Sequence, residues 1–527
     1  MFKRIQQLFR HLAIYGLGDA APALVSFLLL RVYTNYLTTA DYGVIGLLLT
    51  VEGVTRVVFR WGTDSAFMRL FYDCRDDDAR RRLTSTLLLF LTAANGALLV
   101  LGFAATPRIG RYLFEGHLYD GLIRLVIFNT FLTTFHYFPN SLLRIREQSS
   151  TFAVLTAARS IATIVIRLLL VVPLRWGVAG VVLADTFVTV AFTIIMAPWV
   201  LPLLRPVFSR GVLREALRFG LPRVPHALAH QVIAVSDRYL MAAFLTLGEI
   251  GLYGVGSSFG QALKMFLNGF EFAWAPFYYG AMDRSDAKSL YSRLGTYLFA
   301  AVVLLAAGLS AVATDLVRLM TAPEFHRAAI VIPWTAMGVV AQACYQVAAL
   351  GLNITKQTKY FPISTGAAAA FSIVANLLLI PRYGLLGAAW ANAASYAVLT
   401  LTIGWFSYRE YPIRYEWRRL GLVAAAGLVS YGAARWLVPT WPSPLLGLLV
   451  RGSTVAVLFP VLLWVTGFLE PTEWRRLAAL KQSLRATIGL RSTANESVEM
   501  GGEIVADLSG RLDPDSQDRN PGGRKME

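Results

Sequence analysis

The sequence predicts an all-α membrane protein that crosses the bilayer many times, and three observations support this. The chain has 527 residues, of which 56% are hydrophobic and only 15% are charged, whereas soluble domains carry roughly a quarter charged residues. The apolar residues fall into runs of about 20, long enough to cross a bilayer as helices. These runs recur along nearly the whole chain, which a soluble core does not require.

About 14 runs follow one another, and the hydropathy pattern places each to within a few residues. Six spans are expected in an N-terminal lobe (residues 1–208), six in a second lobe (209–410), and two more in residues 411–470. The expected spans are 12–35, 41–62, 83–106, 120–142, 150–172, 177–200, 219–245, 249–273, 293–313, 329–351, 361–380, 384–406, 418–438 and 445–468.

Basic residues in the loops between the spans predict the orientation. If the N-terminus is inside, inner loops hold about 23 Lys and Arg and outer loops about 7, and cytoplasmic loops are the ones enriched in basic residues. Both termini are therefore expected in the cytoplasm. The formal charge of +17 lies mostly in these loops, so it indicates topology rather than nucleic-acid binding.

The first twelve spans form an internal repeat. Both copies begin on the inner side, so they are parallel repeats related by an axis along the membrane normal, an arrangement found in two-lobed transporters. The offset drifts only from about 204 to 208 residues, with Gly and Pro positions matching as well as apolar ones. The aligned segments are 15–17 with 219–221, 41–43 with 249–251, and 173–184 with 381–391.

Two segments follow the last span. Residues 471–490 place Trp474, Leu477 and Leu484 on one helical face beside basic residues, which predicts a helix lying on the inner membrane surface. Residues 491–527 are polar and are expected to be a disordered cytoplasmic tail.

A charged stripe interrupts the second span. Glu52, Arg56, Arg60 and Asp64 are four residues apart and so share one helical face. Each ionisable group inside a bilayer costs about 3 kcal/mol on insertion scales, so the stripe is expected to face a wet cavity. The alternative is that Glu52–Arg56 and Arg60–Asp64 are structural pairs that neutralise themselves.

The repeat strengthens the cavity interpretation. A shift of 208 residues places Arg56 on Lys264 and Arg60 on Asn268, so both lobes carry a cation at the same depth. Two such cations facing a cleft predict a site for an anion. Arg31 and Arg167 are further candidates, because an intramembrane arginine needs a carboxylate, a carbonyl or an anionic ligand.

Other polar groups inside the spans are candidates for ion coupling or ion pairing. His226 and His230 are one helical turn apart, but no third ligand accompanies them, so no metal site is predicted. Asp237 and Arg238 suggest a structural pair or gate. The full set of candidates for coupling or pairing is Asp19, Glu52, Asp64, Asp185, His226, His230 and Glu271.

No nucleotide-binding loop, nucleophile elbow or zinc-protease motif occurs in the sequence. We therefore expect neither an enzyme nor a bound cofactor. An energy source, if one is used, would be an ion gradient or consumption of the product.

Three segments resemble a known family. They are the stretch YGLGDAAPALVSFLLLRVYTNYLTTADYGVIGLL near the N-terminus, FGLPRVPHALAHQVIAVSDRYLMAAFLTLGEIGLYGVG in mid-chain, and FEFAWAPFYYG just after it. With YGLLGAAWANAASYAVL near the twelfth span, they are similar to the polysaccharide flippases of bacterial inner membranes. These belong to the multidrug, oligosaccharidyl-lipid and polysaccharide exporter superfamily, and the resemblance covers roughly residues 10–470.

The resemblance implies a two-lobed fold that moves an oligosaccharide on a polyprenyl pyrophosphate from the cytoplasmic to the periplasmic leaflet. The implied partners are this lipid-linked sugar and membrane lipids. Polysaccharide polymerase or synthase machinery is a further candidate partner, which the C-terminal tail could bind. Arg31, Arg56, Arg60, Arg167 and Lys264 would meet the pyrophosphate. Two alternatives stay open: an ion-coupled multidrug-type exporter, and a membrane glycosyltransferase or polymerase acting on the same carrier.

Overall fold

A computed structural model describes residues 29–146, 148–439 and 441–469. In these ranges the chain forms helices and no strand, which confirms the all-α prediction. Nine helical segments of this part are long and apolar enough to cross a membrane. Each predicted span from 41–62 to 445–468 overlaps a helix, while the total number of crossings and the lobe boundaries at 208 and 410 stay predictions. Residues 12–28 of the first span, Asp19, the surface helix at 471–490 and the tail lie outside the described residues.

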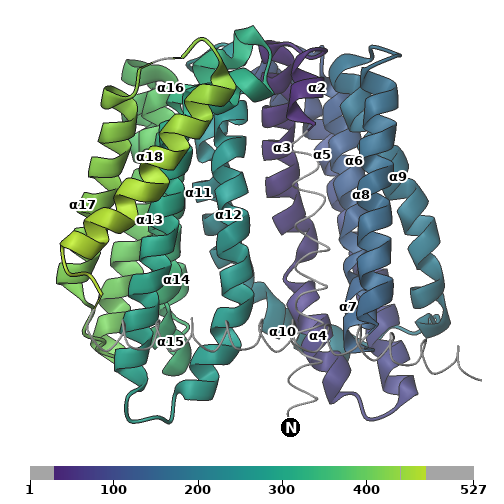
Figure 1. Cartoon of the computed structure of the whole chain (residues 1–527). Coiled ribbons are helices and arrows are strands. Elements are labelled where there is room, and N and C mark those ends of the chain that lie inside the picture. Colours follow the sequence, from purple (N-terminus) through teal and green to yellow (C-terminus); the bar gives the residue numbers. More distant parts are fainter. Residues whose placement is uncertain (1–28, 147, 440, 470–527) are drawn as a thin grey trace, which may run out of the picture. The chain divides into compact units, whose positions relative to one another are not determined.

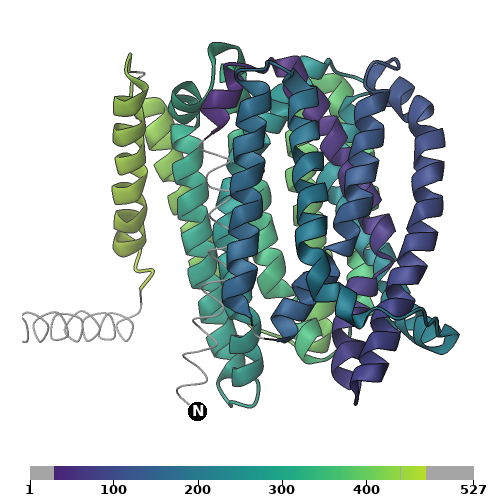
Figure 2. The same ribbon diagram turned by 90° about the vertical axis from the view of Figure 1, so that its right-hand side faces the viewer.

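The first group of helices precedes residue 204. Helix α3 packs against α6 and α9, and α8 packs against α9. Figures 1 and 2 show the long helices of the chain running roughly parallel to one another. The group comprises α2 (Leu30–Thr34), α3 (Thr39–Arg60), α4 (Thr63–Asp73), α5 (Asp77–Phe114), α6 (Asp120–Phe135), α7 (Tyr137–Ile145), α8 (Ser149–Val171), α9 (Gly177–Val200) and η1 (Leu201–Leu203).

The second group begins with α10, which lies against α4 and α5 of the first group. Helix α16 packs on α11 and α14, and α13 packs on α14 and α17. The group comprises α10 (Arg210–Gly220), η2 (Leu221–Arg223), α11 (Val224–Met241), α12 (Leu247–Ala281), α13 (Ala287–Met320), η3 (Pro323–Ile330), α14 (Ile332–Ala348), α15 (Leu350–Ile354), α16 (Tyr360–Glu410), α17 (Trp417–Gly432), η4 (Ala433–Leu437) and α18 (Pro444–Val465). A compact unit ends at Val461, and residues 462–469 belong to a second unit.

Helix α16 contains two of the predicted spans, 361–380 and 384–406. Gly384 separates them with φ 57° and ψ −134°, a backbone conformation that only glycine adopts readily. The short gap between the two hydrophobic runs is therefore a sharp reversal rather than a loop.

The two groups meet where α3 crosses α12, near the upper end of Figure 1 where α2 lies. A Cβ on Gly43 would stand 1.9 Å from the Leu247 carbonyl oxygen, and one on Gly251 would stand 1.8 Å from that of Thr39. The helix backbones therefore touch, which requires glycine at both positions. Gly43 and Gly251 are matching positions of the predicted repeat.

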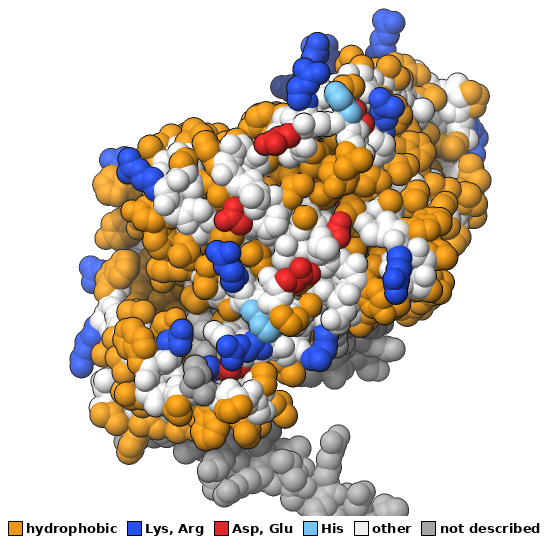
Figure 3. All heavy atoms as spheres, turned by 90° about the horizontal axis from the view of Figure 1, so that it is seen from above, with side chains coloured by type: hydrophobic (Ala, Val, Ile, Leu, Met, Phe, Trp, Pro, Cys, Tyr) orange, Lys and Arg blue, Asp and Glu red, His pale blue; other side chains and the backbone are white. Residues whose placement is uncertain are grey.

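Matching caps start these two helices. Thr38 and Asp41 form a capping box at α3, and Thr246 and Glu249 form one at α12. Each threonine hydroxyl accepts from the N3 amide while the N3 carboxylate accepts from the threonine amide, so both backbone donors are satisfied. The caps hold the two helix starts in equivalent geometry beside the crossing. Seen from above, this end of the molecule carries acidic and basic side chains interspersed with hydrophobic ones (Figure 3).

A second glycine contact lies toward the lower end, where α4 meets α10. A Cβ on Gly62 would stand 2.2 Å from the Gly220 carbonyl oxygen. Trp61 (φ 51°) and Gly62 (φ 67°) adopt left-handed backbone conformations, which end α3 and separate it from α4. Buried Asn95 on α5 supports this break: its Nδ2 donates to the Phe59 carbonyl at 2.9 Å, and its Oδ1 accepts from Trp61 Nε1 at 2.9 Å.

A buried ion pair fastens α18 to α13. The Arg451 guanidinium donates to Asp315 Oδ2 at 2.6 Å, and both side chains are 2% exposed. Gly447 makes room for this pair, since a Cβ there would stand 2.6 Å from Asp315 Oδ1.

Substitution of Arg451 by leucine is expected to destabilise the fold by about 3–5 kcal/mol, because removal of one partner leaves a buried charge uncompensated. The measurement is the thermal unfolding temperature of the purified protein in detergent. The double variant Asp315→Leu, Arg451→Leu should recover most of the loss. Equal instability of the single and double variants would show that the pair is not the cause.

Candidate functional site

A polar cavity of about 740 Å³ lies between α3 of the first group and α11, α12, α14 and α16 of the second. Its walls combine charged groups with amide and hydroxyl groups. The polar lining residues are Glu52, Arg56, Arg60, Gln231, Asp237, Arg238, Tyr253, Ser257, Gln261, Lys264, Thr335, Gln342, Asn392 and Tyr396. The cavity therefore brings together Arg56 and Lys264, which the repeat predicted to face each other.

Helix α3 supplies one wall through its charged stripe. The Arg56 guanidinium pairs with Glu52, and Arg60 Nη1 lies 3.5 Å from Asp64 Oδ2. Both pairs considered as an alternative from the sequence are therefore formed. The arginine side chains are nonetheless 49% and 45% exposed, and exposed pairs contribute only about 0–1 kcal/mol, so a ligand can compete for either guanidinium.

Lys264 on α12 supplies a further positive charge, from the wall that faces α3. No carboxylate of the described residues forms an ion pair with Lys264. Glu271 lies two turns further along α12, where its Oε2 accepts a hydrogen bond from Gln346 Nε2 at 3.0 Å, and it does not line the cavity. Lys264 thus presents its charge to the cavity without an ion-pair partner in contact, and Glu271 acts on it only at longer range.

Asp237 and Arg238 also line the cavity. The sequence suggested only a structural pair or gate for them, not a place in the binding site. Asp237 is buried; its Oδ2 accepts from the Tyr253 hydroxyl and, at 3.3 Å, from Asn392 Nδ2. Arg238 Nη2 donates to Ser257 Oγ at 2.9 Å. These partners come from α12 and α16, so only the folded chain brings them to Asp237 and Arg238 on α11.

A smaller cavity of about 170 Å³ adjoins the first at its lower end. Arg60 and Val57 line both cavities, and Asp64 and Arg223 line only the smaller one. The Arg223 guanidinium stacks on the Phe219 ring with 4.4 Å between its central carbon and the ring centre. Arg60 therefore stands where the two spaces meet, next to the Gly62–Gly220 contact.

The remaining sequence candidates lie elsewhere. Arg167 forms a two-pronged pair with Asp185 at 2.9 and 2.6 Å, between α8 and α9. Arg31 donates to the Leu319 carbonyl oxygen, so neither arginine lines the described cavity. His226 Nδ1 lies 3.0 Å from Thr365 Oγ1, and His230, one turn further along α11, is also outside the cavity lining. In the described ranges, no group of three or more His, Cys, Asp or Glu side chains is placed to hold a metal ion.

The charge of the cavity is positive. Among the described residues that line it, four are cations (Arg56, Arg60, Arg238 and Lys264) and two are carboxylates (Glu52 and Asp237). Such a lining favours an anionic ligand, and arginine binds phosphate groups with two parallel hydrogen bonds.

A profile for polysaccharide biosynthesis proteins matches residues 33–330, more than half of the chain. The chain belongs to this family. The matched stretch of this polysaccharide biosynthesis protein contains α3, α11 and α12, which carry most of the cavity charges. The family resemblance drawn from the sequence is therefore confirmed. No curated protein matches the chain.

Solved structures share the fold of this polysaccharide biosynthesis protein. The lipid II flippase MurJ in an inward closed conformation is 14% identical with a TM-score of 0.69, covering 88% of this chain and 99% of its own. An inward-facing multidrug resistance MATE transporter of the MOP superfamily is 14% identical with a TM-score of 0.61, covering 79% and 96%. A Vibrio cholerae MATE transporter is 14% identical with a TM-score of 0.52, covering 77% and 96%. The polysaccharide biosynthesis protein thus has a multi-pass transporter fold.

Proposed function

We propose that this protein flips a polyprenyl-pyrophosphate-linked oligosaccharide from the cytoplasmic to the periplasmic leaflet of the bacterial inner membrane. The observation that carries the proposal is the cavity between the two helix groups, where Arg56 and Lys264 lie on opposite walls. The pyrophosphate is the strongest anion of such a substrate, and these cations match it. MurJ, named as a lipid II flippase, has the same fold, which supports the proposal.

The cavity dimensions suit this substrate class. A volume of about 740 Å³ lies within the usual range for small-ligand sites, roughly 300–1,000 Å³. We place the pyrophosphate and the adjoining sugars there, among the glutamine, asparagine and tyrosine side chains, while the polyprenyl tail stays in the bilayer. Alternating access then exposes the cavity to each side in turn, with both termini in the cytoplasm and a polysaccharide polymerase or synthase receiving the product.

The competing functions have less support. An exporter of organic cations calls for an acidic or aromatic cavity, whereas the charges described here are mostly cationic. A glycosyltransferase or polymerase needs room for a catalytic site outside the bilayer, and the described connections at the upper end are short, such as residues 115–119 and 242–246.

The test is leaflet accessibility of a fluorescent lipid-linked oligosaccharide in proteoliposomes. We expect the protein to expose the sugar to a membrane-impermeant lectin, whereas liposomes with an unrelated membrane protein show no exposure. Uptake of a cationic dye without sugar exposure would replace the flippase proposal by the exporter, and chemical change of the glycan would replace it by an enzyme.

A further inference from the structure

Arg159 on α8 is a half-buried cation whose direct partners are neutral. Its Nη1 lies 3.1 Å from His136 Nδ1 and its Nη2 donates to Thr189 Oγ1 at 3.3 Å. A guanidinium has no acceptor atom, so His136 Nδ1 must accept and the imidazole proton sits on Nε2. His136 Nε2 lies 2.8 Å from Thr193 Oγ1, which fits this assignment. Arg159 is thus held in place without a neutralising carboxylate in contact.

The nearest carboxylate of α9 is already engaged. Asp185 receives two hydrogen bonds from Arg167, at 2.9 and 2.6 Å. Both of its oxygens are used in this planar pair, the strongest geometry available to an arginine and a carboxylate. Asp185 therefore directs its hydrogen bonds to Arg167 and acts on Arg159 only at longer range, without contact.

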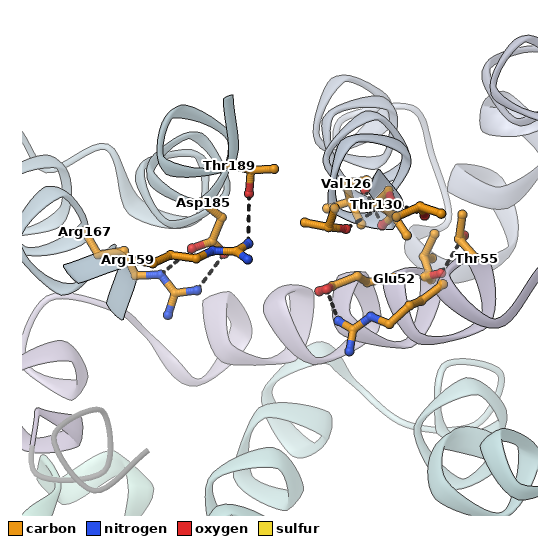
Figure 4. Close-up of polar contacts among 12 residues, drawn as sticks. Glu52, Thr55, Val126, Thr130, Arg159, Arg167, Asp185 and Thr189 are labelled. Atoms are coloured by element: carbon orange, nitrogen blue, oxygen red, sulfur yellow. Dashed lines mark hydrogen bonds and ion pairs between the residues drawn. The ribbon is translucent and has the colours of Figure 1, made fainter. Parts of the chain in front are cut away.

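Glu52 is the other carboxylate within electrostatic range of Arg159. Figure 4 shows the Arg159 side chain extending from α8 toward the side of α3 that carries Glu52. Arg56 forms an ion pair with the same carboxylate. Glu52 is 21% exposed, and Arg56 is 49% exposed on the cavity side. Glu52 thus lies between a cation that faces the cavity and a cation inside the first helix group.

The charges of this cluster balance only without Arg56. Arg159 and Arg167 oppose Glu52 and Asp185, two against two, and Arg56 is the surplus positive charge. An anion in the cavity that draws Arg56 away would leave the other four groups neutral as a set. The cluster can therefore release Arg56 without leaving an isolated charge in the bilayer, which would be costly.

We infer that Glu52 exchanges partners, from Arg56 to Arg159, when a pyrophosphate occupies the cavity. This inference rests on the proposed function and makes Arg159 a positioning residue that touches no substrate. The empty cavity keeps Arg56 paired, and the occupied cavity leaves Arg56 on the ligand with Glu52 held by Arg159. Ligand binding at Arg56 is thereby linked to the charge pairing between Glu52 on α3 and Arg159 on α8.

The experiment is a double-mutant cycle on the full-length protein in detergent, with affinity for a soluble short-chain polyprenyl pyrophosphate measured by calorimetry. Arg159→Gln should weaken binding about fivefold or more, because Glu52 then keeps its hold on Arg56. Glu52→Gln frees Arg56, so in that background Arg159→Gln should change the affinity by less than about twofold. Arg144→Gln on α7, whose guanidinium stacks on Phe152, is the matched control and should bind like the wild type.

Each other outcome has a definite meaning. An equal loss on Arg159→Gln with and without Glu52 would overturn the exchange but leave the flippase proposal standing. A wild-type protein that does not bind the probe would overturn the proposed function itself. Arg159→Lys keeps the charge and guards against misfolding of the glutamine variant; it should bind within about twofold of the wild type, since a single carboxylate needs the charge more than the planar fork.

Discussion

Substitution of both Arg56 and Lys264 by glutamine is expected to lower the rate of lipid-linked oligosaccharide transfer at least about a hundredfold. Hydrogen bonds to charged groups contribute about 1.5–3 kcal/mol each, and the two residues lie on opposite walls of the cavity. Their removal takes away both halves of the proposed pyrophosphate site. The measurement is the initial rate of sugar exposure in proteoliposomes, at equal protein incorporation and equal thermal stability.

Two further variants separate a binding role from a structural one. Glu52→Gln combined with Arg56→Gln removes both partners of the ion pair and leaves the net charge of the cluster unchanged. If Arg56 served only that pair, this double variant would transport normally. We expect it to stay impaired. Arg214→Gln, at an exposed position of α10, is the control and should transport like the wild type. Full activity of the Arg56, Lys264 double variant would contradict the cationic site.

The second large effect is expected from Gly43→Ala. The added Cβ would meet the Leu247 carbonyl oxygen at 1.9 Å, well inside contact distance, so α3 and α12 must separate at their crossing. We expect the cavity to stay open at the end of the molecule that is uppermost in Figure 1. The rate of transfer should then fall at least about tenfold. A cysteine at Gln261, which lines the cavity, should then react faster with an impermeant maleimide from that side, in a chain whose Cys74 and Cys344 are replaced by serine.

Gly254→Ala is the matched control for this substitution. It lies on α12 three residues beyond Gly251, and a Cβ there meets no atom within 4 Å. It should therefore change neither labelling nor transfer. If Gly43→Ala leaves the labelling rate unchanged, the crossing is a fixed contact rather than a gate.

The local sequence was enough to predict the membrane-spanning helices and the charged face of α3 that lines the cavity. Hydrophobic runs place a helix at each described span, because a bilayer demands about 20 apolar residues for every crossing. They do not predict the shorter helices, such as α4 and α10. The four-residue spacing of Glu52, Arg56 and Arg60 places them on one helical face. The internal repeat then aligns Arg56 with Lys264 and predicts an equivalent cation in the second lobe. These inferences use neighbours in the sequence or one constant offset.

The missed parts join positions far apart in the chain. Asn392 donates to Asp237 across 155 residues, and Arg451 reaches Asp315 across 136. Spacing along one helix contains no information on such partners, because they depend on which helices become neighbours. The same limit explains Arg167, whose carboxylate partner Asp185 lies on the next helix.

The Asp315–Arg451 pair has a consequence for how the protein is made. During synthesis α13 enters the membrane long before α18, so Asp315 must wait, without its partner, until the last described helix is inserted. A chain that ends between these helices leaves Asp315 as a buried carboxylate without its ion-pair partner, and an uncompensated buried charge is strongly destabilising. The fold around α13 is therefore complete only in chains that have been translated through Arg451.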